Sequence, residues 1–144
     1  MTSLMDAALA YAAKDIPVFP CREKKPLTKH GFKDASTSPD QISAWWTRWP
    51  DAWIAIPTGK VSGFDVLDLD SKKGKNGFVR VPEWERLTPL IALTPSGGAH
   101  LYFKADGVTC SADKIALGVD TRGDGGYIII PPSPGYRWQN GGIT

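Results

Sequence analysis

The sequence predicts one domain of the mixed α/β (α+β) class, a sheet core with flanking helices. Two observations carry this prediction: helical periodicity in the first third of the chain, and a strand-rich second half. A chain of 144 residues, of which 42% are hydrophobic, is long enough to bury one core. Neither an internal repeat nor a domain boundary interrupts the pattern, so we expect a single domain over residues 1–144.

Two helices are predicted from apolar spacing and end signals, and a third, short one at 82–87. Residues 4–14 form an alanine-rich amphipathic segment that stops before Pro17. Ser38-Pro39 fits an N-cap followed by proline at the first helical position, which opens a helix to Trp49. One apolar face of this helix has i, i+3, i+4 spacing, which favours core packing of its tryptophans over base stacking. Its members are Ile42, Trp45, Trp46 and Trp49.

Strands are predicted where short apolar runs lie between turn residues. Residues 21–38 contain no such run, and we interpret them as a long polar loop. The expected strands are 16–19, 53–56, 64–70, 91–94, 99–104, 116–120 and 127–130.

Asp68 and Asp70 end the apolar strand predicted at 64–70. Because side chains alternate along a strand, the two carboxylates share one face, opposite Leu67 and Leu69. Paired carboxylates repel each other and resist desolvation, so such a pair is most stable with a cation between its members. Hard oxygen ligands favour Mg²⁺ or Mn²⁺, which commonly also bind substrate phosphates. An ordinary strand running into a polar turn at 71–74 remains an alternative.

A second candidate segment is Ser96-Gly97-Gly98-Ala99-His100, just before the strand-like Leu101-Tyr102-Phe103. The two glycines can form a tight turn whose exposed backbone N–H groups suit an anion. Ser96 and His100 would place a hydroxyl and an imidazole beside it. The alternative is a two-glycine hairpin with an incidental histidine.

A third candidate segment runs from Asp120 to Gly126. Asp120 ends a short apolar segment before a glycine-rich turn, so it can supply a third carboxylate. Arg122 can reach phosphate or template, or it can brace the glycine turn. By itself, Gly-Asp-Gly-Gly fits an ordinary β-turn.

Together these segments resemble the N-terminal domain of bifunctional primase-polymerases, in the archaeo-eukaryotic primase superfamily. That family carries an Asp-hydrophobic-Asp motif, a Ser-Gly-Gly-x-His motif and a later Asp-x-Arg-Gly-x-Gly-Gly motif, in the order and approximate spacing found here. The resemblance covers nearly the whole chain, from about Ala7 to Trp138. One departure is Asp65, where the family usually has an aliphatic residue; we interpret it as structural or solvent-facing.

The resemblance implies an RRM-like mixed sheet and a metal-dependent nucleotidyltransferase, a DNA primase/polymerase. Such an enzyme starts or extends primers on single-stranded DNA from dNTP or NTP. Two Mg²⁺ or Mn²⁺ ions would be held by Asp68, Asp70 and Asp120. The nucleotide would be bound by Ser96, Gly97, Gly98, His100 and Arg122. Because family members commonly continue into helical regions or a helicase, we expect the N-terminal part of a longer replication protein, with a fused or associated helicase as a candidate partner.

The formal net charge of +2 does not by itself indicate nucleic-acid binding, but the basic residues are clustered. One cluster lies in the loop at 22–33 and another follows the aspartate pair. Phosphate or DNA contacts are expected at Lys25, Lys29, Lys72 and Lys73. Solvated loop lysines are the alternative.

The cysteines and the hydrophobicity of the chain indicate its cellular location, and two other functions stay open. Cys21 and Cys110 are outside any CxxC pair, so we expect free thiols and no zinc site. With no secretory signal or membrane-length apolar run, we expect a cytoplasmic protein. The resemblance implies a prokaryotic, plasmid, prophage or phage replication context. The alternatives are a catalytically weak single-stranded nucleic-acid-binding module and a metal-dependent nuclease. The Ser-Gly-Gly-x-His segment favours a triphosphate substrate over simple hydrolysis.

Overall fold

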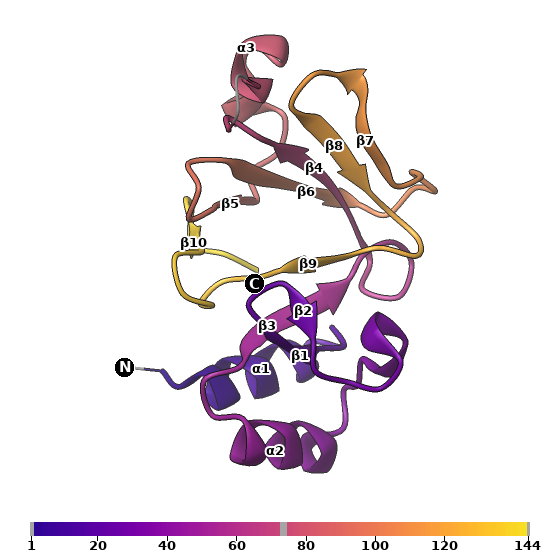
Figure 1. Ribbon diagram of the computed structural model, residues 1–144, viewed down its shortest axis with the longest axis vertical. Helices are drawn as coiled ribbons and strands as arrows, with labels where there is room; N and C mark the ends of the chain where they lie inside the picture. Colours follow the sequence, from indigo (N-terminus) through magenta and orange to yellow (C-terminus); the bar gives the residue numbers. More distant parts are fainter. Residues whose placement is uncertain (1, 73–74, 144) are drawn as a thin grey trace.

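The structure is a computed structural model that describes residues 2–72 and 75–143. It confirms the mixed α+β class, with the strands divided between two sheets (Figure 1). Helices α1 (Leu4–Ala12) and α2 (Pro39–Arg48) lie beside the smaller sheet, and the short α3 (Gly77–Arg80) lies at the far end of the larger one. None of the helices in the described part of the chain has the length and apolarity needed to cross a membrane.

The smaller sheet has four strands in the order β2-β1-β3-β9, all paired antiparallel. Its strands are β1 (Phe19–Arg22), β2 (Lys25–Pro26), β3 (Trp53–Pro57) and β9 (Tyr127–Ile129). The expected polar loop at 21–38 is therefore wrong: it contains the end of β1, all of β2 and the 3₁₀ helix η1 (Gly31–Asp34). Backbone hydrogen bonds between β1 and β2 do not require an apolar sequence, so hydrophobic patterning did not reveal this hairpin.

The larger sheet has six strands in the order β10-β5-β6-β4-β8-β7, again paired antiparallel. Its central strand β4 pairs with β6 on one side and with β8 on the other. Its strands are β4 (Phe64–Leu69), β5 (Ile91–Leu93), β6 (Ala99–Lys104), β7 (Ser111–Ala116), β8 (Val119–Arg122) and β10 (Arg137–Trp138).

Several predicted boundaries shift in the structure. The strand expected at 16–19 begins only at Phe19, since Val18 makes an isolated bridge to Ser36. The strand expected at 116–120 is two strands, because Gly118, at φ +83°, forms the turn between β7 and β8. The helix expected at 82–87 is a single 3₁₀ turn, η2 (Trp84–Arg86).

The two longer helices begin as the sequence predicts. The Ser38 hydroxyl accepts the backbone N–H of Gln41, with proline at the start of α2. Ile42 and Trp46 of α2 are fully buried in the main core, and Trp45 and Trp49 are partly buried against it. The tryptophans of α2 therefore belong to the core.

Strand β4 has two faces with different neighbours. Val66 packs in the core between the sheets, with Tyr102 of β6, and we call this the inner face. Leu67 and Leu69 lie on the outer face, which η2 and the segment around α3 cover. Side-chain alternation puts Asp68 on the inner face and Asp65 on the outer one.

Asp65 is buried, at 3% exposure, so its interpretation as solvent-facing is wrong and the structural one fits. Its Oδ2 accepts backbone N–H groups from Asp106 at 2.8 Å and Val108 at 3.4 Å. The carboxylate therefore fixes the loop between β6 and β7 onto β4.

Candidate functional site

A cavity of about 570 Å³ lies between the two sheets and gathers most of the predicted site residues. Predicted residues that line it are Asp68, Asp70, Lys72, Ser96, Gly98, His100 and Arg122. Three separate sequence motifs thus meet at one place, because β4, β6 and β8 are neighbours in the larger sheet.

Strand register places three predicted residues in one row across the inner face. Asp68 lies directly opposite His100 of β6 on one side and directly opposite Asp120 of β8 on the other. Directly opposed residues of antiparallel strands project from the same face, with Cβ atoms roughly 5 Å apart. The row His100–Asp68–Asp120 therefore follows from backbone pairing alone.

His100 and Asp68 interact inside the cavity wall. The His100 Nε2 atom is 3.6 Å from Asp68 Oδ1, longer than a good hydrogen bond. Burial raises the pKa of the Asp68 carboxyl, but its interactions with His100, and the charges of Arg122 and Lys24, outweigh burial and hold that pKa below its ordinary value. Asp68 is therefore a carboxylate at neutral pH. His100 is only 7% exposed, and its Nδ1 has no hydrogen-bond partner among the described residues.

The carboxylate of Asp120 already interacts with neighbouring residues. Its Oδ1 accepts the backbone N–H of Asp113 at 2.9 Å, and its Oδ2 lies 3.6 Å from an Arg122 nitrogen. Arg122 also donates to the backbone carbonyls of Ser111 and Thr121. Arg122 thus braces β7 against β8 while lining the cavity, and Asp120 lies beside the cavity rather than among its lining residues.

Asp70 follows the last residue of β4, where the chain leaves the sheet. Its Oδ1 accepts the backbone N–H of Lys72 at 2.9 Å, the local bond that aspartate commonly makes in a turn. Asp70 and Lys72 both line the cavity, so this turn contributes a carboxylate and a cation to its lining.

The turn between β5 and β6 does not have the free amides that the sequence suggested. Gly97 N–H donates to the Thr94 carbonyl at 3.1 Å, and Gly98 N–H donates to Thr94 Oγ1 at 3.1 Å. Gly98 is instead required by close packing, since a Cβ there would lie 2.5 Å from the Leu69 carbonyl oxygen. Gly98 therefore lets this turn pack closely against the end of β4, and Ser96 of the same turn lines the cavity.

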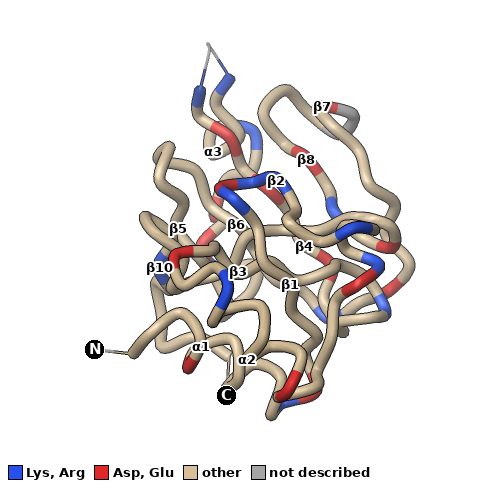
Figure 2. The backbone as a smooth tube through the Cα atoms, turned by 60° about the horizontal axis from the view of Figure 1, so that its bottom comes forward, with Lys and Arg blue, Asp and Glu red and all other residues tan. Residues whose placement is uncertain are grey.

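The predicted lysines separate into two groups. Lys72 lines the cavity, whereas Lys25 and Lys29 are exposed and outside its lining. Lys73 lies outside the described residues. Lys24, which lies outside the contacts predicted from the sequence, lines the cavity from the tip of the β1–β2 hairpin. Figure 2 shows the basic residues of this hairpin around the β2 label.

The hairpin that carries Lys24 is held by Tyr127. The Tyr127 hydroxyl donates to the Lys24 carbonyl at 2.8 Å, and its ring stacks with Phe32 at 6.4 Å between centroids. Phe32, Trp53, Tyr127 and Tyr136 form an aromatic wall opposite the larger sheet. These four residues come from separate segments of the chain, so no local sequence motif marks them as a set.

The three aspartates have the ligand chemistry of the expected divalent ions. Asp68, Asp70 and Asp120 provide the hard oxygen atoms that Mg²⁺ and Mn²⁺ prefer, on or next to one face. Among the described residues, however, no group of three or more acidic, histidine or cysteine side chains is already gathered tightly enough to hold a metal. The three carboxylates therefore match the ions in ligand type, while each already interacts with other protein groups.

Fold and site together define an α+β protein with an acidic row, a histidine and several cations around one cavity, a set suited to phosphate chemistry. Residues 8–143 match the family model of the bifunctional DNA primase/polymerase N-terminal domain, and the chain belongs to this Prim-Pol family. Membership indicates a protein of the DNA primase/polymerase type, which acts on nucleotides and DNA. No curated protein matches the chain.

Proposed function

We propose that this domain is a metal-dependent nucleotidyltransferase that extends or starts primers on single-stranded DNA. The observation that carries the proposal is the row in which Asp68 lies between His100 and Asp120, on the wall of a cavity with three cationic side chains. A cavity of about 570 Å³ is within the range of small-molecule sites. We propose that the incoming dNTP or NTP binds there.

Asp68, Asp70 and Asp120 are the proposed ligands of two Mg²⁺ or Mn²⁺ ions. When bound, such ions lower the pKa of an attacking 3′-hydroxyl and stabilise the departing pyrophosphate. Asp68 suits this role because the pKa of its carboxyl is already held below its ordinary value, so no proton has to leave before an ion binds.

The remaining polar groups would bind and orient the triphosphate. Lys24 and Lys72 approach from opposite sides of the cavity, from the small sheet and from the end of β4, and supply positive charge. His100 offers a ring nitrogen beside Asp68 and can donate a hydrogen bond to a phosphate oxygen in either of its protonation states. Arg122 is the proposed third cation, held in place by its bonds to Ser111 and Thr121.

A single-stranded nucleic-acid-binding module is the second candidate, and one observation favours it. Asp120 and Asp70 already accept backbone N–H groups, and the described residues contain no preformed metal cluster. If metal binding does not overcome these interactions, the domain would bind nucleic acid without useful catalysis.

Primer extension on single-stranded DNA tests the proposal, with Mg²⁺ or Mn²⁺ and with or without a primer. We expect extension that requires both ion and dNTP and is lost in Asp68→Asn, while Asp51→Asn, at an exposed aspartate outside this cavity, remains active. DNA binding without extension would support the binding module. Metal-dependent loss of DNA without dNTP would indicate a nuclease instead.

A further inference from the structure

Tyr136 is a buried cavity residue whose hydroxyl has no hydrogen-bond partner among the residues that the structure describes. It lies between β9 and β10, where its backbone N–H donates to the Ser133 carbonyl at 2.9 Å. The residue is 6% exposed and lines the cavity. No described residue forms a hydrogen bond with its hydroxyl, in contrast to Tyr127 of the same wall, whose hydroxyl donates to Lys24. The small exposed part of the residue belongs to the cavity wall, so this hydroxyl is available to a ligand or water in the cavity.

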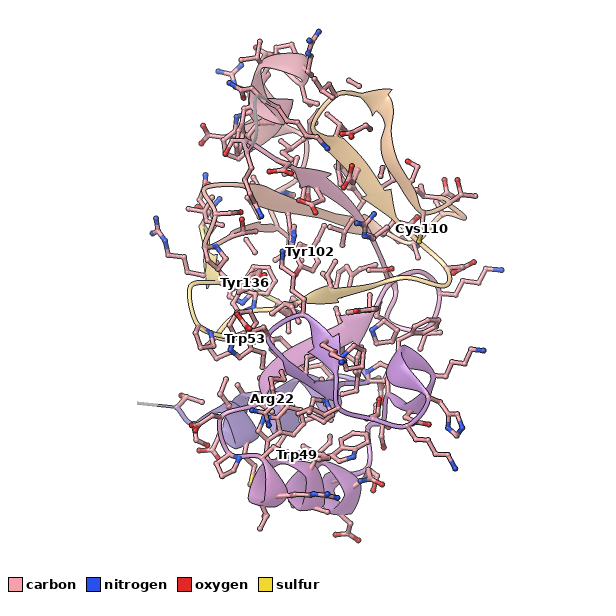
Figure 3. The ribbon with its side chains drawn as sticks, viewed as in Figure 1. Arg22, Trp49, Trp53, Tyr102, Cys110 and Tyr136 are labelled. Carbon is pink, nitrogen blue, oxygen red and sulfur yellow. The ribbon has the colours of Figure 1, made fainter. Side chains whose placement is uncertain are left out.

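The position of Tyr136 is fixed by rings on both sides. Its centroid is 6.1 Å from that of His100 and 5.8 Å from that of Trp53, which meets it edge to face. Figure 3 shows Tyr136 and Trp53 together at one end of the space between the sheets, with Cys110 at the other end. Tyr136 is therefore the member of the aromatic wall that contacts the polar row on the large sheet, through His100.

The phenol remains a hydrogen-bond donor over the working pH range. Burial and the nearby charge of Asp68 raise the pKa of Tyr136 to about 12. The hydroxyl therefore keeps its proton at neutral pH and can donate to one ligand oxygen while it accepts from another.

The chemistry of the two walls indicates where each part of a bound nucleotide would lie. The phosphates of a nucleotide would lie near the cations and His100, because these groups can neutralise and hydrogen-bond them. The base would lie against a flat apolar surface such as that of Trp53 or Phe32. In a nucleotide, the sugar joins these two parts. Tyr136 lies where the two walls meet, so the group that it faces is the sugar.

We propose that the Tyr136 hydroxyl forms a hydrogen bond with a sugar hydroxyl of the bound nucleotide and is thus a specificity-determining residue of this site. The inference rests on the proposed function, because it requires a nucleotide in this cavity. A site whose buried polar group is matched to a substrate hydroxyl rejects an analogue that lacks it, since the protein group is then left unpaired. The domain would accordingly disfavour nucleotides that have no sugar hydroxyl.

The test compares wild-type protein with Tyr136→Phe, which keeps the ring and its packing. Calorimetry in the presence of Mn²⁺ would measure the affinity for CTP, dCTP, dideoxy-CTP and inorganic tripolyphosphate. We expect the variant to bind CTP and dCTP about 3- to 10-fold more weakly. We expect it to bind dideoxy-CTP, which has neither sugar hydroxyl, and tripolyphosphate, which has no sugar, as the wild type does.

Tyr127→Phe is the matched control, because its hydroxyl is used to hold the Lys24 hairpin. This variant should lower the affinity for all four ligands by a similar factor. An equal loss for dideoxy-CTP and dCTP in Tyr136→Phe, or unchanged affinity for both CTP and dCTP, would overturn the inference alone. Folded wild-type protein that binds none of the nucleotides would overturn the proposed function and this inference together.

Discussion

The two walls of the cavity are built in different ways. The wall from the larger sheet carries Asp68, His100 and Arg122 on three adjacent strands, at positions fixed by hydrogen-bonded register. The opposite wall takes Phe32 from a 3₁₀ helix, Trp53 from β3 and Tyr136 from a loop. The first wall can be inferred from motifs once the strands are paired, whereas the second exists only when distant segments pack together.

The difference also separates two kinds of interaction with a nucleotide. The large-sheet wall is charged and suited to phosphate and metal, and the aromatic wall offers flat surfaces suited to a base. Variants on the two walls should therefore be distinguishable by which part of the ligand they affect.

The largest effect is expected from Asp68→Asn, on the charged wall. Loss of one carboxylate charge removes a proposed metal ligand, so primer extension should fall by about 100-fold or more while the fold persists. Extension rates and circular dichroism on the same samples would measure both quantities. Full extension activity in this variant would exclude the metal assignment.

Asp65→Ala tests the other face of the same strand. Two backbone N–H groups would lose their acceptor, so the free energy of unfolding should fall by about 2 kcal/mol in urea denaturation. Asp106→Ala is the control, because it removes an exposed side chain and keeps the backbone N–H that bonds Asp65. A folded Asp65→Ala protein that loses extension while its stability is unchanged would contradict a purely structural role.

The aromatic wall is tested by Phe32→Ala. Phe32 stacks on Tyr127 and is only partly buried, so its removal should leave the fold intact and weaken nucleotide binding by about 10-fold. Tripolyphosphate, which has no base, should bind as before. His100→Ala, on the charged wall, should weaken the binding of both the nucleotide and tripolyphosphate. If both variants lost affinity for the two ligands in the same ratio, the two walls would not bind different parts of the nucleotide.

A smaller effect is expected from Lys24→Ala, with Lys25→Ala as its neighbour and control. Lys24 lines the cavity and Lys25 does not. Because Lys24 is exposed, we expect triphosphate affinity to fall only about 2- to 5-fold, and to change little in the control. Titration at low and high salt would measure the triphosphate affinity of both variants. Equal losses of affinity in Lys24→Ala and Lys25→Ala would indicate a general effect of net charge and not a specific contact.

The smallest effect is the pH dependence of stability through Asp68. The pKa of its carboxyl is lower in the folded chain than its ordinary value, so the folded state binds fewer protons than the unfolded state in that range. Its contribution is complete above the ordinary value and is lost as the pH falls through the lower folded value. Urea unfolding at pH 5 and pH 3 should show a smaller decrease for Asp68→Asn than for the wild type.

Local sequence patterns were enough to predict the α+β class, the helix starts and the strands that bury apolar residues. Ser38-Pro39 marked the beginning of α2, and the apolar runs at β4, β6 and β9 marked their strands. These features are local, since capping and side-chain alternation depend on residues a few positions apart. The polar motifs of the site could be identified in the sequence for the same reason, because each consists of residues close together in the chain.

Which motifs meet, and which other residues complete the site, depends on how the chain folds in three dimensions. Strands β2, β7 and β10 are held by backbone pairing and leave little trace in hydrophobic pattern. Lys24 rather than Lys25 reaches the cavity because of the direction of a two-strand hairpin, and Asp65 is buried because a loop folds over it. Tyr136 lies alone in a loop, and its place between His100 and Trp53 follows from contacts between residues far apart in the chain. Such contacts depend on how whole sheets pack, and no local pattern of residues encodes them.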